Sequence, residues 1–354
     1  MNQLPRVRSV AGVGGVKSPT ARAGLGFQSD KRPSDYERLA AGAEQFGFDV
    51  VSVFGDLYFQ PPLPALLAMA RATSSIALGP ACLNPYLLHP IEIAGQIAAL
   101  DVASSGRAFL GLARGAWLSD LGVDQGGDPE DVAEAAAVVR ALLGGDRRGV
   151  SGARFVLPPG ASLRTRPFRS FVPLLIGTWG PRLGRIAGEI ADEVKVGGSA
   201  NPAMVQLMHK WTAAGAVAAG RGTGSVGVVV GAVTVVDEDG RVARQRARRE
   251  VAPYLDVVGG LDPTVELPAG LLEGIGVALR TSGPEGAASL IPDEILDLFA
   301  FAGTPGAVAE HAVDLLRAGA LRVDFGTPHG ITDDHGLELL GARVLPAIRE
   351  EMGD

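Results

Sequence analysis

The segment from residue 74 to residue 122 constrains the fold more than any other part of the chain. An apolar run at residues 76–78 leads into a break rich in proline and asparagine, and a helical pattern with isoleucines on one face follows. A second apolar run, residues 107–112, ends in the glycine-bracketed sequence Gly111-Leu-Ala-Arg-Gly115. Two successive strands that end in small residues predict a place where a planar ligand can approach the backbone closely, as cofactors do in α/β proteins.

The remainder of the chain repeats this alternation of strands and helices. Further strands are predicted at residues 23–27, 50–54, 172–177, 193–196, 226–236 and 321–325. Helices are predicted at residues 34–46, 63–72 and 128–143. The first helix is expected to begin at Ser34 as N-cap, with Glu37 completing a capping box. Eight strands that alternate with helices predict a parallel (β/α)8 TIM barrel, and an open doubly wound sheet is the alternative.

Three segments depart from the simple repeat. Residues 1–20 lack an apolar core of signal-peptide length and are expected to form a flexible arm before a single barrel domain of residues 21–354. Residues 144–167 are rich in glycine, proline and arginine and predict a short hairpin. Residues 237–303 are too long for one crossover, so they are predicted to insert helices over the barrel mouth between strands 7 and 8.

Charge and cysteine content exclude several classes of function. The net charge of −7 argues against nucleic acid or an anionic membrane as the main partner. No uninterrupted apolar run approaches the ~18 residues of a membrane-spanning helix. The one cysteine, Cys82, excludes an internal disulfide and a zinc site of several cysteines, which fits a cytoplasmic protein. The five histidines lack metal-binding spacings, so no metal is expected.

Four motifs, in order along the chain, resemble those of the luciferase-like oxidoreductases that depend on flavin or deazaflavin. They are the segment described first, Gly47-Phe-Asp-Val-Val51, Ile176-Gly-Thr-Trp-Gly-Pro181 and Gly303-Thr-Pro305. The resemblance is strongest to the branch of methylenetetrahydromethanopterin reductases and other enzymes that use coenzyme F420. It implies a luciferase-like barrel, F420 as cofactor, a homodimer, and hydride transfer between the reduced deazaflavin and a small or medium organic substrate. An FMN-dependent monooxygenase and a non-catalytic flavin-binding barrel are the alternatives.

The loop after the fifth strand is a candidate phosphate site. Gly177, Thr178, Trp179 and Gly180 lead from a strand into a helix that is expected to begin at Pro181, where a missing N–H costs nothing. Free backbone N–H groups and the positive end of the helix dipole would meet there, and an ordinary tight turn is the alternative. The resemblance implies that this loop holds the cofactor phosphate.

The end of the third strand is a second candidate site. The resemblance implies a bulge with a non-proline cis peptide against the cofactor ring, and Ala81-Cys82 matches that bond. Cys82 could equally be a small buried hydrophobe, which is the commonest fate of an isolated cysteine. Asn84 is expected either to donate to the ring or to start the turn before Pro85.

The segment after the second strand supplies the candidate catalytic residue, Asp56, whose carboxylate could also bind the cofactor ring. Its alternative role is to cap a turn. Relatives that oxidise sugar phosphates have a histidine after this aspartate and a glutamate after the strand-4 glycine, and these positions are Leu57 and Ala116 here. The resemblance therefore speaks against that acid–base pair. An apolar substrate pocket is expected instead, built from Leu57, Tyr58, Trp117 and Trp179.

The end of the fourth strand completes the predicted cofactor site. Ala113 and Gly115 allow backbone contact with the ring, and Arg114 could hold a phosphate, a carboxylate or the acidic tail of the cofactor. A surface salt bridge is the alternative for Arg114. Ser119 falls where the resemblance places a further polar contact with the cofactor.

Overall fold

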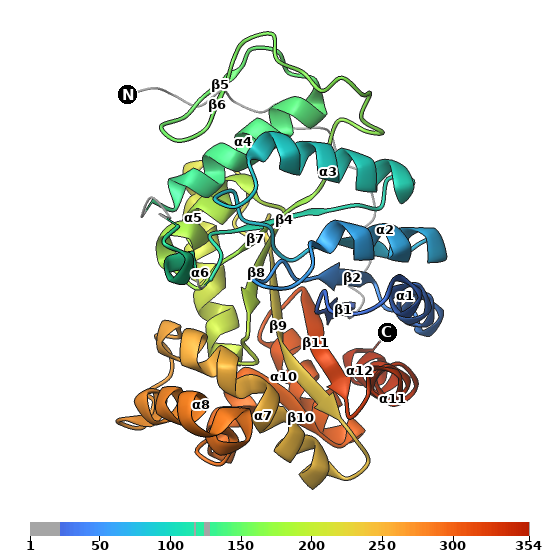
Figure 1. Ribbon diagram of the computed structural model, residues 1–354, viewed down its shortest axis with the longest axis vertical. Coiled ribbons are helices and arrows are strands. Elements are labelled where there is room, and N and C mark those ends of the chain that lie inside the picture. Colours follow the sequence, from blue (N-terminus) through green and yellow to red (C-terminus); the bar gives the residue numbers. More distant parts are fainter. Residues whose placement is uncertain (1–21, 117, 124–127, 354) are drawn as a thin grey trace.

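The computed structural model describes residues 22–116, 118–123 and 128–353, apart from the side chains of residues 119 and 120. The expected N-terminal arm of residues 1–20 and Trp117 lie outside the described residues. Eight parallel strands form the barrel, with helices packed around them (Figure 1). In the order in which they pair, these are β3 (Ala77–Pro80), β2 (Val50–Val53), β1 (Arg22–Phe27), β11 (Arg322–Gly330), β9 (Gly227–Val236), β8 (Glu193–Gly197), β7 (Leu174–Gly177) and β4 (Leu110–Ala113).

The two ends of this sheet meet and nearly close the barrel. Isolated parallel bridges join Leu78 to Ala108 and Leu83 to Leu112, which brings β3 beside β4. The strands thus follow one another around the barrel in chain order, as the alternation of strands and helices predicts. The parallel TIM barrel is confirmed, and the open doubly wound sheet is not the fold.

Helices connect successive barrel strands and cover them from outside. They are α1 (Pro33–Phe46), α2 (Pro62–Ala72), α3 (Pro90–Ala103), α4 (Glu130–Gly144), α5 (Pro181–Ile190), α6 (Pro202–Ala218), α10 (Pro305–Arg317), α11 (Asp333–Leu339) and α12 (Leu345–Met352). Two short 3-10 turns, η1 (Leu118–Leu121) and η2 (Gly259–Leu261), and a π-helical turn, η3 (Leu340–Val344), complete the connections. The predicted hairpin is present as β5 (Val150–Ser151) and β6 (Val156–Leu157).

The insertion between β9 and β11 contains three helices. They are α7 (Gly240–Val258), α8 (Leu271–Ala288) and α9 (Asp293–Phe299), and α7 and α8 lie together at the end of the molecule opposite the hairpin (Figure 1). A separate apolar cluster, which includes Leu255, Leu296 and Phe299, packs these helices against the end of β9. The insertion also ends in a strand that the sequence analysis missed. This strand, β10 (Ala300–Gly303), pairs parallel with β9 beyond the barrel.

Several predicted boundaries differ from the structure by one to a few residues, and two of the differences are informative. Helix α1 begins at Pro33 with Arg32 at the N-cap position, and no side chain caps it, so the expected capping box of Ser34 and Glu37 is absent. Proline suits the first helical position because its missing N–H needs no partner there, and the helix starts one residue early. Strand β11 continues past residue 325 through a register shift between Gly326 and His329.

None of the described helices combines the length and the apolar character that crossing a bilayer requires. In the same ranges, no group of three histidine, cysteine, aspartate or glutamate side chains is arranged to hold a metal ion.

Candidate functional site

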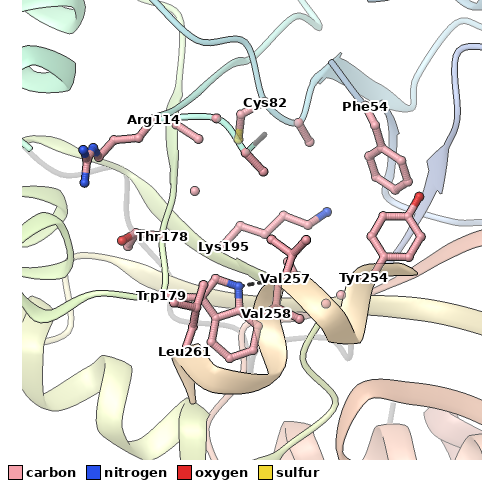
Figure 2. Close-up of a pocket in the computed structure, with 18 of the residues that line it drawn as sticks. Phe54, Cys82, Arg114, Thr178, Trp179, Lys195, Tyr254, Val257, Val258 and Leu261 are labelled. Carbon is pink, nitrogen blue, oxygen red and sulfur yellow. Dashed lines mark hydrogen bonds between the residues drawn. The ribbon is translucent and has the colours of Figure 1, made fainter. Parts of the chain in front are cut away.

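A cavity of about 860 Å³ opens where the barrel strands end. Every barrel strand, or the loop after it, contributes to its wall, and the contributing residues include Gly26, Gly55, Cys82, Ala113, Thr178, Gly197, Ala232 and Gly326. Helix α7 and turn η2 form the opposite wall with Val251, Tyr254, Val257, Val258 and Leu261 (Figure 2). The insertion therefore covers the barrel mouth and leaves a largely apolar chamber beneath it, which is the usual place for ligand binding in this architecture.

The loop after β7 is held in place by its own polar groups. The indole N–H of Trp179 donates to the carbonyl oxygen of Gly197 at 2.8 Å (Figure 2). The backbone N–H of Gly180 donates to Thr178 Oγ1 at 3.0 Å. Helix α5 begins at Pro181, as expected, and no side chain caps its first turn. The first amides of α5 are therefore open to a ligand in the adjacent cavity.

Ion pairs connect the first turn of α5 to the start of α4. One guanidinium nitrogen of Arg182 lies 2.8 Å from Asp128 Oδ1 and 2.8 Å from Glu130 Oε2. This contact links the first turn of α5 to the start of α4 through one nitrogen of a side chain that also lines the cavity. A phosphate at this position would depend on backbone N–H groups and on the helix dipole.

The strand β3 segment adopts the geometry that the resemblance implies. The peptide bond between Ala81 and Cys82 is cis. Burial raises the pKa of the Cys82 thiol to about 12, although nearby Lys195 acts in the opposite direction. The thiol is therefore neutral near pH 7, as a small buried group and not a nucleophile. Asn84 Oδ1 accepts a hydrogen bond from the Leu87 backbone N–H at 3.0 Å, so its carbonyl oxygen starts the turn, and its amide group remains on the cavity wall.

Asp56 lines the cavity and does not cap a turn. One of its carboxylate oxygens accepts a hydrogen bond from Gln28 Nε2 at 3.0 Å. Burial raises the pKa of Asp56, and the bond from Gln28 only partly offsets this effect. Leu57 also lines the cavity, but Tyr58 is not among the lining residues, and its side chain is 81% exposed. The expected role of Tyr58 as a pocket residue is therefore wrong.

The end of β4 brings Ala113, Arg114 and Gly115 to the cavity wall. Arg114 Nε is buried and has no hydrogen-bond partner among the described side chains, while the guanidinium interacts with the Tyr86 hydroxyl. The alternative of a surface salt bridge is therefore not realised in the described part of the chain. The backbone of Ser119 lies in η1, and its side chain, like Trp117, is outside the described residues.

The sequence analysis did not identify two residues of the cavity: Tyr254, on the wall formed by the insertion, and Lys195, which carries a charge. Tyr254 comes from the inserted helix α7, and nothing in its local sequence marks it as facing the barrel mouth. Burial raises the pKa of Tyr254, and the charge of Asp56 adds to the effect. Lys195 lies on β8 with its ammonium group inside the barrel (Figure 2). A lysine between two valines in a buried strand was the available signal for it.

The chain as a whole matches one known family. The sequence profile described as luciferase-like monooxygenase matches residues 14–322. The chain belongs to this family. Its fold and the cis peptide at the end of β3 agree with the expectation drawn from the four motifs.

Individual relatives match over nearly their whole length. The chain is 30% identical over 336 residues to the 5,10-methylenetetrahydromethanopterin reductase of Archaeoglobus fulgidus, and the match covers 92% of this chain and 99% of that protein. The solved structure of the coenzyme F420-dependent tetrahydromethanopterin reductase from Methanopyrus kandleri superimposes with a TM-score of 0.83 at 26% identity, covering 93% and 99% of the two chains. An F420-dependent secondary alcohol dehydrogenase shares the fold, with a TM-score of 0.73 at 20% identity over 92% of this chain and 99% of that one.

Proposed function

We propose that this protein is an F420-dependent oxidoreductase that transfers a hydride between the reduced deazaflavin and a small or medium organic substrate, with reduction of the substrate as the favoured direction. The observation that carries the proposal is the match to an F420-dependent reductase over 99% of that chain at a TM-score of 0.83. The partial match to an F420-dependent glucose-6-phosphate dehydrogenase of Microbacterium testaceum, 33% identical over 176 residues, points to the same cofactor.

The residues at the cavity fit such a group. An ideal Cβ at Gly197 would meet no atom within 4 Å, and one at Gly180 would come no closer than 4.0 Å to Thr178 Oγ1, so both glycines leave room that a ligand can occupy. The uncapped first turn of α5 suits a phosphate, and the guanidinium of Arg114 on the cavity wall suits an acidic tail. The backbone at Ala81 and Gly115 would lie against the planar ring.

The bound cofactor supplies the hydride, and the protein supplies position and shielding. The walls from α7 and η2 partly cover the chamber, so a bound cofactor and substrate would displace water from it, which favours hydride transfer over side reactions. Leu57 and Ala116 replace the acid–base pair of the sugar-phosphate dehydrogenases, so orientation contributes most of the rate enhancement. Asp56 is a carboxylic acid on the cavity wall, and its raised pKa suits a proton donor.

The test is a binding comparison followed by an assay. F420 and FMN are titrated separately into the purified protein, and tighter binding of F420 is expected. Reduced F420 should then be oxidised when a substrate is added. Purification of the protein with a yellow flavin, or tighter FMN binding, would favour an FMN-dependent monooxygenase instead.

The proposal includes a homodimer. Light scattering on the purified protein would show a monomer if that part is wrong.

A further inference from the structure

The interior of this barrel contains a buried charged pair beneath the cavity. Lys195 on β8 is 6% exposed and Asp324 on β11 is 2% exposed, and Lys195 Nζ lies 2.7 Å from Asp324 Oδ2. Two glycines make room for them. A Cβ at Gly231 would lie 3.2 Å from Lys195 Cε, and a Cβ at Gly24 would collide with Asp324 Oδ1. The pair is therefore accommodated by the strands on either side of it.

The charges of this pair are tied into a larger network. Arg322 Nε donates to Asp324 Oδ1 at 2.7 Å, and Arg322 Nη1 donates to Glu193 Oε1 at 2.7 Å. Burial alone would raise the pKa of Asp324, but the cations of Arg322 and Lys195 lower it to about 2. Asp324 is thus ionised and shared between two cations, so the charge of Lys195 is only partly balanced by its own partner.

The ammonium group of Lys195, which lines the cavity, has N–H donors that Asp324 does not use. An ammonium group carries three N–H donors, and Asp324 is the one acceptor of Lys195 in the described part of the chain. The ring of Phe54 lies 6.0 Å from Nζ, and the side chain extends through the chamber toward it (Figure 2). An ammonium in apolar surroundings attracts an oxygen that carries negative charge far more strongly than it would in water.

We propose that Lys195 is an oxygen-binding residue of the substrate site, and that the substrate is a carbonyl compound whose oxygen lies against its ammonium group. This inference rests on the proposed function, because the reduced deazaflavin is the reductant. The hydride brings two electrons to the carbonyl carbon, the carbon–oxygen π bond breaks, and its electron pair moves to oxygen. Lys195 stabilises the resulting oxyanion, and the proton that completes the alcohol comes from Asp56.

Benzoate is the probe, because its carboxylate resembles the oxyanion and it cannot be reduced by hydride transfer under these conditions. Benzoate and benzyl alcohol are titrated by calorimetry into the F420-loaded protein and into Lys195→Met. We expect Lys195→Met to weaken benzoate binding at least tenfold and to change benzyl alcohol binding less than twofold. Failure of benzoate to bind the unaltered protein, or equal affinities in both proteins, would overturn the proposal.

Controls separate this inference from the proposed function and from misfolding. Lys210→Met removes an exposed lysine on α6 and should leave benzoate binding unchanged. F420 affinity is measured on its own, so loss of the cofactor is distinguished from loss of the anion site. If Lys195→Met does not fold, the double change Lys195→Met with Asp324→Asn removes both charges of the pair. Retention of benzoate affinity in that protein would equally refute the proposal.

Discussion

Valine at position 180 should weaken F420 binding without destabilising the protein. Gly180 has a φ of −107° and a ψ of 151°, and the following Pro181 itself favours this extended backbone, which valine also prefers. The new side chain would project into the cavity, because an ideal Cβ there comes no closer than 4.0 Å to another residue. It would hold a phosphate away from the first amides of α5.

The magnitude follows from the contact that is lost. A hydrogen bond to a charged group contributes about 1.5–3 kcal/mol, which corresponds to a roughly 10- to 150-fold weaker affinity. The assay is a titration with F420, in which binding is measured by the quenching of tryptophan fluorescence. Gly224→Val is the matched control, because a Cβ there meets nothing within 4 Å and Gly224 is not among the cavity-lining residues. An affinity within twofold of the unaltered protein would refute the phosphate role of this loop.

Valine at position 177 provides a contrasting outcome. A Cβ there would lie 2.9 Å from Cys82 Sγ and 3.2 Å from Ala113 Cβ, so the side chain points into protein and not into the cavity. Overpacking of this kind costs about 1–3 kcal/mol of stability. We therefore expect Gly177→Val to unfold at lower urea concentration, whereas Gly180→Val should retain its unfolding midpoint. If both variants lose stability alike, the distinction drawn from the two glycine environments is wrong.

Three further perturbations test other parts of the structure. Arg322→Met breaks the buried network around Asp324 and should cost about 3–5 kcal/mol in urea unfolding. Since burial raises the pKa of Asp56, kcat/KM should fall as the pH rises through that pKa, and Asp56→Asn should abolish this limb of the profile. Burial opposes ionisation of Glu44, but backbone N–H groups at residues 74–76 lower its pKa to about 2. Its stabilisation is complete above the unfolded value near 4.5 and disappears toward pH 2, so Glu44→Gln should flatten the acid limb of urea-unfolding stability.

Local sequence patterns determined much of this protein. The alternation of apolar runs with helical patterns identified the barrel, the hairpin at β5 and β6, and the helix that begins at Pro181. These features depend on periodicity and turn chemistry within about ten residues, so they can be read along the chain. The strand ends that line the cavity were found for the same reason, because parallel strands bring their carboxyl ends to one edge.

The tertiary structure alone decided which distant residues meet in the site. Lys195 and Asp324 are 129 positions apart, and they become neighbours because β9 pairs with β8 on one side and with β11 on the other. Tyr254 reaches the cavity only because the insertion folds back over the barrel mouth and buries its own apolar cluster against β9. Strand register and the packing of an inserted helix depend on contacts summed over the whole barrel, and no local pattern encodes them.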